Sequence, residues 1–184
     1  MPRFHAPGLK VWDPFTRIIH WGMVASVSVA WLVAEGAIHD TAGHTLLFLI
    51  AFRILWGFVG PEHARFTNFI RAPHSVLQYA RQLRSGRELR YIGHNPLGGW
   101  MIVALLGTGL MAALTGWLYT TDAYWGVAFV ERIHVFFAEL LLVLATFHIL
   151  GVLITSFRQR ENLIAAMFHG KKRRERDGTT RGTN

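Results

Sequence analysis

The sequence contains no cysteine, and charged residues account for only 16% of its 184 residues. The absence of cysteine excludes disulfide bonds, cysteine-bound zinc, iron–sulfur clusters and thiol nucleophiles. A soluble domain carries about 25% charged residues, so this chain has too few to cover a surface that faces water. Apolar residues make up 52% of the chain, which favours a membrane protein, and the length fits one domain.

The apolar residues are concentrated in four stretches, each long enough to cross the hydrocarbon core of a bilayer. A helix needs about 17–25 apolar residues for this crossing. None of the stretches carries the polar stripe of a soluble helix, which argues against the alternative of a buried soluble bundle. We therefore predict an all-α membrane protein, a bundle of four transmembrane helices, with spans over residues 18–34, 37–59, 97–119 and 133–157.

Basic residues define the expected orientation of these spans. The net charge is +8, and all Lys and Arg except Arg53 and Arg132 fall in residues 1–19, residues 60–96 and the tail from residue 158. By the positive-inside rule, we expect both termini to be cytoplasmic and the chain to lie in a bacterial inner membrane, without a cleavable signal peptide. The charge is then topogenic and faces anionic lipid head groups, so nucleic acid is not expected as a partner.

Segments outside the spans have simpler patterns. Residues 73–84 and 159–168 are predicted to form short amphipathic helices on the cytoplasmic surface. The final residues are polar and lack the apolar side chains that a packed fold requires. We assign residues 1–173 to the membrane domain and residues 174–184 to a disordered cytoplasmic tail.

Histidines are numerous, and five of the ten lie within or at the edges of the predicted spans. An ionisable side chain at membrane depth is costly and marks a functional site by default. His134 and His148 are 14 residues apart, so at 100° per residue they share one face of the last helix, with a rise of about 21 Å between them. The five are His20, His39, His44, His134 and His148.

Each imidazole of the last span has a candidate partner at its own depth. His20 begins the first span at the level of His148. The second span begins at the level of His134 and offers His39 or His44. Facing imidazoles in a helix bundle are typical of bis-histidine haem b sites, which need no cysteine. Zinc would require three or four ligands clustered at one depth, and a proton relay would require a series of carboxylates.

Helical geometry favours His39 over His44. Arg53 lies in the second span level with His148, where haem propionates would be its bidentate partners; the alternative is a side chain that extends to the cytoplasmic interface. Arg53 and His39 are 14 residues apart and share a helix face, whereas His44 falls on the opposite face. Gly43 lies on the face of His39 and leaves room for a porphyrin plane.

Several segments resemble the prokaryotic di-haem cytochrome b561 family, which includes the cytochrome b subunit of nickel–iron hydrogenases. They are VWDPFTRIIHW around His20, His39 with Gly43 and FRILWGFVG in the second span, ARFTNFIRAP and YIGHNPLGG before the third, and HVFFAELLLVLATFHI with ENLIAAMFHGKKR at the end. The resemblance covers residues 10–173. The loop of residues 120–132 is shorter than in those hydrogenase subunits.

The resemblance implies two haem b groups, held by the pairs His20/His148 and His39/His134, and electron transfer between the quinone pool and a redox partner. A bis-histidine iron has no open position, so it passes electrons rather than binding a substrate. We expect a transmembrane electron carrier. Its candidate partners are a periplasmic c-type cytochrome or hydrogenase subunits, quinone, membrane lipid and a second copy of the chain in a homodimer.

Two alternative functions are a stand-alone superoxide:quinone oxidoreductase, as some family members are thought to be, and a membrane scaffold without redox activity. The oxidoreductase needs a positively charged periplasmic entry, for which Arg132 is the available residue. The quinone is expected beside His94 and Asn95, ahead of the third span. The alternative for these two residues is that they cap that helix before Pro96. The sequence does not decide whether the chain is itself an enzyme.

Overall fold

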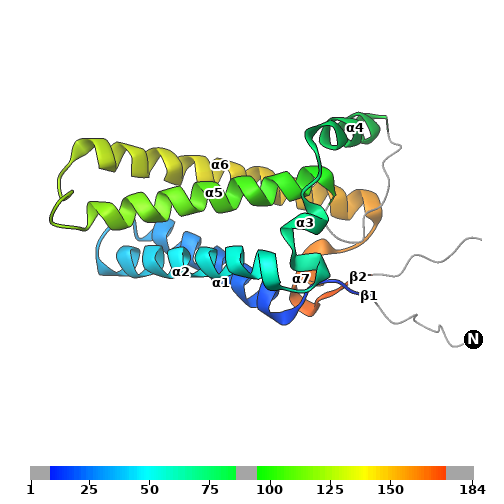
Figure 1. Ribbon diagram of the computed structural model, residues 1–184, viewed down its shortest axis with the longest axis horizontal. Helices are drawn as coiled ribbons and strands as arrows, with labels where there is room; N and C mark the ends of the chain where they lie inside the picture. The colour runs from blue at the N-terminus through cyan, green and yellow to red at the C-terminus, as the bar shows by residue number, and fades with distance from the viewer. Residues whose placement is uncertain (1–8, 86–94, 173–184) are drawn as a thin grey trace, which may run out of the picture.

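The computed structural model describes residues 9–85 and 95–172. His94 and the predicted tail at residues 174–184 lie outside the described residues, and so does the boundary between domain and tail. Four long helices run side by side as two hairpins, α1 with α2 and α5 with α6, and the hairpins meet through α2 and α5 (Figure 1). These helices are α1 (Pro14–Leu32), α2 (Ala37–Val59), α5 (Pro96–Tyr119) and α6 (Ala128–Gln159).

The long helices lie where the apolar stretches predict them, with the largest difference at the start of the last one. α6 begins at Ala128, whereas the apolar pattern predicts a span from residue 133. The apolar pattern marks only the part of a helix that can lie in lipid. Charged residues also have adequate helix propensity, so α6 includes residues 128–132 although Glu131 and Arg132 are charged. The loop between α5 and α6 is therefore shorter than predicted and covers residues 120–127.

Capping residues define the helix ends. Asp13 accepts a hydrogen bond from the backbone N–H of Thr16 at 3.0 Å and begins α1. Asn95 does the same for α5, since its Oδ1 accepts from the N–H of Gly98 at 2.7 Å, and Pro96 follows at the first helical position. The capping function considered for Asn95 is therefore confirmed by the geometry.

The two ends of the bundle differ in how much protein covers them. The loop end carries the turns at residues 33–36 and 120–127. The termini end carries all the short elements (Figure 1), namely β1 (Leu9–Lys10), η1 (Glu62–Ala64), α3 (Phe66–Phe69), α4 (Pro73–Arg84), α7 (Leu163–His169) and β2 (Lys171–Lys172).

The two predicted amphipathic helices correspond to α4 and α7. α4 coincides with the predicted residues 73–84. α7 starts later than the predicted residue 159, because Arg160 adopts a left-handed conformation with φ of 49° and ends α6. Asn162 then starts α7 as its cap, accepting from the N–H of Ala165 at 2.9 Å.

Three contacts fasten β1 and the N-terminal half of α1 to the chain after α6, and we call them the clasp. β1 pairs antiparallel with β2, with Leu9 opposite Lys172. The Arg17 guanidinium donates a hydrogen bond to the carbonyl of Phe168, and the ring of Trp21 stacks on that of Phe168 with centroids 4.1 Å apart. The clasp holds α7 against the first turns of α1.

Apolar character distinguishes three of the described helices. α2, α5 and α6 are long and apolar enough to cross a membrane. α1 is not among them, and its first half contains Arg17 and His20. Large apolar side chains such as Phe147 are exposed along the bundle, which suits contact with lipid. The buried core lies between α2 and α5 and contains Leu46, Ile50, Leu106 and Ala113.

Candidate functional site

The structure brings His39 of α2 and His134 of α6 together near the loop end. Their ring centroids are 6.0 Å apart, and the ring planes are nearly perpendicular, at 84°. Both side chains are half-buried. The two residues were selected from the sequence by helix periodicity and depth, and they face each other across the bundle.

Each ring of this pair has one nitrogen engaged with a backbone carbonyl. His39 Nδ1 lies 2.9 Å from the carbonyl of Ala30, and His134 Nδ1 lies 2.9 Å from the carbonyl of Ala112. A carbonyl only accepts, so each Nδ1 must carry the proton and each Nε2 keeps its lone pair. This arrangement fixes the tautomer that a metal requires of an imidazole.

The Ala30 carbonyl is accessible because of where α1 ends. The last four carbonyls of a helix have no partner within it, and α1 ends at Leu32. The turn of residues 33–36 returns the chain so that His39, in the first turn of α2, meets that carbonyl. The same hydrogen bond therefore caps α1 and orients the ring.

The separation of the rings suits a shared metal ion. A metal–imidazole bond is about 2.0–2.1 Å, so two imidazoles on opposite sides of one ion have centroids roughly 6 Å apart, as His39 and His134 do. No group of three or more His, Asp or Glu side chains within residues 9–85 and 95–172 is arranged to hold a metal ion. The pair therefore fits a metal held by two protein ligands, as in a bis-histidine haem.

The second pair, His20 of α1 and His148 of α6, lies nearer the termini end. Both rings are half-buried. α1 packs along α2 and α6 packs along α5, so the two histidines belong to different hairpins of the bundle. The Nδ1 of His20 is buried and has no hydrogen-bond partner, in contrast to the Nδ1 atoms of His39 and His134.

Buried side-chain nitrogens without a hydrogen-bond partner are concentrated in the halves of α1 and α2 that lie at the termini end. Buried polar atoms nearly always have a hydrogen-bond partner, yet five side-chain nitrogens in the described part of the chain have none. Such a concentration of donors suits a ligand that brings acceptors, and carboxylates are the strongest acceptors available. The five atoms are Arg17 Nε, His20 Nδ1, Trp21 Nε1, Arg53 Nη1 and Trp56 Nε1.

Arg53 is the most deeply placed charge of this group, with only 5% of its surface exposed. Its Nη2 donates to the carbonyl of Ala64 at 3.3 Å, and its guanidinium lies 5.2 Å from the ring centroid of Phe66. The side chain is therefore buried, and both contacts belong to η1 and α3 at the termini end of the bundle. Its second terminal nitrogen, Nη1, is unpaired.

Gly43 and His44 lie on different surfaces of α2. A Cβ at Gly43 would have no atom within 4 Å, so the helix surface there is open on the face predicted for a cofactor. His44 is exposed, and its Nδ1 contacts the carbonyl of Asp40 one turn earlier in the same helix, at 2.7 Å. The structure thus brings His39, and not His44, to His134.

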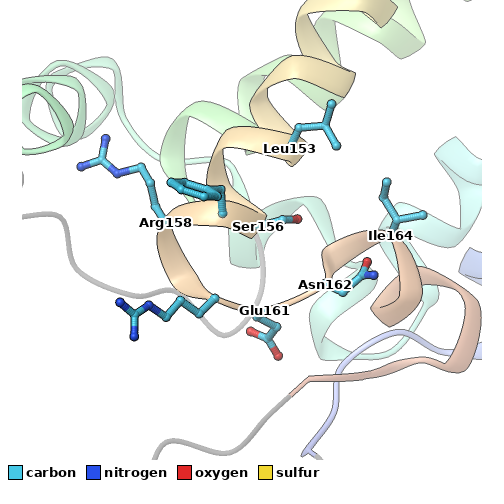
Figure 2. Close-up of a pocket in the computed structure, with 8 residues that line it drawn as sticks. Leu153, Ser156, Arg158, Glu161, Asn162 and Ile164 are labelled. Carbon is cyan, nitrogen blue, oxygen red and sulfur yellow. The ribbon is translucent and has the colours of Figure 1, made fainter.

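The hollow that opens at the end of α6 is separate from these pairs. It measures about 770 Å³ and lies between α6 and α7, where Figure 2 shows Ser156 and Asn162 near the turn and Leu153 and Ile164 above it. No histidine lines it. It does not form part of the candidate site.

Comparison with known protein families gives one match. The chain matches the family model described as prokaryotic cytochrome b561 over residues 11–170. The chain belongs to the prokaryotic cytochrome b561 family. The predicted resemblance is thereby confirmed. No curated protein and no solved structure matches it.

Membership of the cytochrome b561 family makes this chain a transmembrane cytochrome b of electron transfer, and it implies that haem b is bound. The donor set fits that cofactor, because facing imidazoles and unpaired buried donors are present in one bundle. Sequence reasoning missed the α5 backbone beside His134, which comprises the carbonyl of Ala112 and the close approach at Gly116. The glycines of α5 were the one feature of the sequence that could have indicated this close approach, but their spacing does not single out Gly116.

Proposed function

We propose that this chain carries electrons across the bacterial inner membrane through two haem b groups, between the quinone pool and a periplasmic redox partner. The observation that carries the proposal is the pair His39/His134, whose rings face each other at 6.0 Å with both Nδ1 atoms engaged elsewhere. Histidines that bind metals almost always make this second hydrogen bond.

In this proposal, His20 and His148 hold the second haem, and Arg53 binds its carboxylates. A bound haem supplies a reversible one-electron change at its iron. The two histidines of each pair would hold the iron, and an iron with two imidazole ligands would leave no position for oxygen or a substrate. The buried Nη1 of Arg53 and the open surface at Gly43 support these assignments.

The proposed topology has four membrane crossings with both termini cytoplasmic. The clasp supports it, because the pairing of β1 with β2 brings the chain before α1 and the chain after α7 to one end of the bundle. A chain whose two ends share one side crosses the membrane an even number of times, so α1 adds a fourth crossing to those of α2, α5 and α6. The chain has no cysteine, so labelling of single introduced cysteines from either side tests this topology.

The redox partner is proposed to be a periplasmic c-type cytochrome or hydrogenase subunits, and the chain itself to form a homodimer. Both would contact the protein at or beside the loop end, where short turns leave the bundle uncovered. Purification from native membranes in mild detergent, followed by mass determination of the intact complex, identifies the partner. A complex containing neither type of redox protein would refute this assignment.

The quinone is proposed to bind near the start of α5, beside His94 and Asn95. His94 would exchange the proton there, since the pKa of histidine lies near neutrality. We expect His94→Ala to slow quinone-linked turnover several-fold while the haem content stays at the wild-type level. His74→Ala, which removes a histidine of α4, is the matched control. Turnover equal to that of the control would remove His94 from the site.

Haem stoichiometry tests the central proposal. We expect the purified protein to contain two haem b per chain, with the optical and electron paramagnetic resonance spectra of low-spin iron bound by two imidazoles. The measurement is the pyridine haemochrome against protein determined by amino-acid analysis. One haem per chain in the wild type, or a high-spin spectrum, would contradict the arrangement of two bis-histidine sites.

A further inference from the structure

Helix α5 approaches His134 closely at one glycine. A Cβ placed on Gly116 would lie 2.9 Å from Cε1 and 3.0 Å from Nδ1 of the His134 ring. Real Cβ atoms essentially never approach other atoms so closely, so the ring would have to move. The absence of a side chain at position 116 thus creates the surface on which the ring of His134 lies.

The same surface contains the carbonyl that orients the ring. Ala112 lies one turn before Gly116, and its carbonyl oxygen is 2.9 Å from Nδ1 of His134. A side chain four residues later on a helix stands beside such a carbonyl, so glycine keeps it accessible from α6. The buried hydroxyl of Thr115 donates to the carbonyl of Met111 at 2.6 Å and, more weakly, to that of Ala112 at 3.1 Å, and hydroxyls of this kind bend a helix slightly.

We propose that Gly116 is a positioning residue for the His39/His134 haem site. It lets the His134 ring reach the Ala112 carbonyl while the ring keeps its separation from His39. A Cβ at position 116 would push the ring either off the carbonyl or out of its 6.0 Å relation to His39. The first movement weakens electron donation to the iron, because the hydrogen bond at Nδ1 raises the basicity of the ligand. The second removes one axial ligand. This inference rests on the proposed function, in which the pair binds haem.

The test compares two glycine-to-alanine variants of the same helix. Gly116→Ala is the test variant. Gly107→Ala is the control, because a Cβ at Gly107 has no atom within 4 Å. Both changes favour helix formation, so a loss in one variant alone cannot come from helix propensity. The measurements are haem content, the low-spin paramagnetic resonance signals and a potentiometric titration that resolves the two haems.

We expect Gly116→Ala to lose at least half of the haem at the His39/His134 site, or to keep it with an altered low-spin signal and midpoint potential. The His20/His148 haem should stay unchanged and reports that the bundle is folded. Gly107→Ala should match the wild type in all three measurements. A Gly116→Ala protein with wild-type haem content, signals and potentials would overturn the inference.

A second variant covers the case in which Gly116→Ala does not fold. Thr115→Val keeps the shape of the side chain but removes the hydroxyl that donates to the carbonyls of Met111 and Ala112. Its removal leaves His134 as the side-chain donor to the Ala112 carbonyl. We expect the haem of the His39/His134 pair to be retained with a lower midpoint potential, and an unchanged potential would count against the inference. Failure of the proposed function is distinguishable from both results, since the wild-type protein would then lack a haem at this pair.

Discussion

Replacing His148 with alanine is expected to remove one of the two haem groups and to leave the other. His20 would then be the sole protein ligand at its site. The His39/His134 pair lies at the other end of the bundle, where both rings are fixed by backbone carbonyls. The haem content should fall from about two per chain to about one, with the low-spin spectrum of the retained haem unchanged.

Circular dichroism of the His148→Ala protein is the control for folding, and it should retain the helical content of the wild type.

Replacement of Arg53 tests the same haem site through its midpoint potential. Arg53→Met keeps the volume but removes the charge beside the proposed carboxylates, so the midpoint potential of the His20/His148 haem should fall. Arg53→Lys keeps the charge and should retain most of that potential. Loss of both haems in His148→Ala, or equal potentials in the two Arg53 variants, would contradict these assignments.

The choice between His39 and His44 predicts a second large effect. His39→Ala should abolish binding of the haem shared with His134, because it removes the ring 6.0 Å from that residue and also the cap on the Ala30 carbonyl. His44→Ala should change neither haem, since His44 is exposed and contacts only the carbonyl of Asp40 on its own helix among the described residues. Haem content of the two purified variants is the measurement.

The two variants control each other, because each removes one imidazole from neighbouring turns of α2. His39→Ala also leaves the half-buried carbonyl of Ala30 without the His39 ring, so its melting temperature is compared with that of His44→Ala. Loss of a haem in His44→Ala, with a full complement in His39→Ala, would reverse the assignment.

Helix periodicity and depth predicted that His39 meets His134. His39 and Arg53 are 14 residues apart, as are His134 and His148. In a regular helix, residues 14 apart lie on the same face. The structure accordingly places His39 at His134 and Arg53 inside the fold. Long apolar stretches likewise predicted the main helices, because a run of apolar residues has few other conformations in a membrane.

Contacts between side chains and the backbone of another helix could not be predicted in this way. The carbonyls of Ala30 and Ala112 belong to residues whose side chains carry no signal, and their function depends on where α1 ends and how α5 packs against α6. The close approach of the His134 ring to Gly116 depends on the same packing of α5 against α6. The clasp was also missed, since strands of two residues have no recognisable period.

The unequal covering of the two ends of the bundle gives the two histidine pairs different surroundings. At the loop end, His39 lies in the first turn of α2, next to the short turn of residues 33–36 with which the bundle ends (Figure 1). At the termini end, α7 is held over the start of α1 by the stack of Phe168 on Trp21, and Trp21 is the neighbour of His20. In the proposed topology, a water-soluble electron donor or acceptor would therefore have its shortest approach at the loop end, whereas a carrier dissolved in lipid would reach the other pair sideways, between helices.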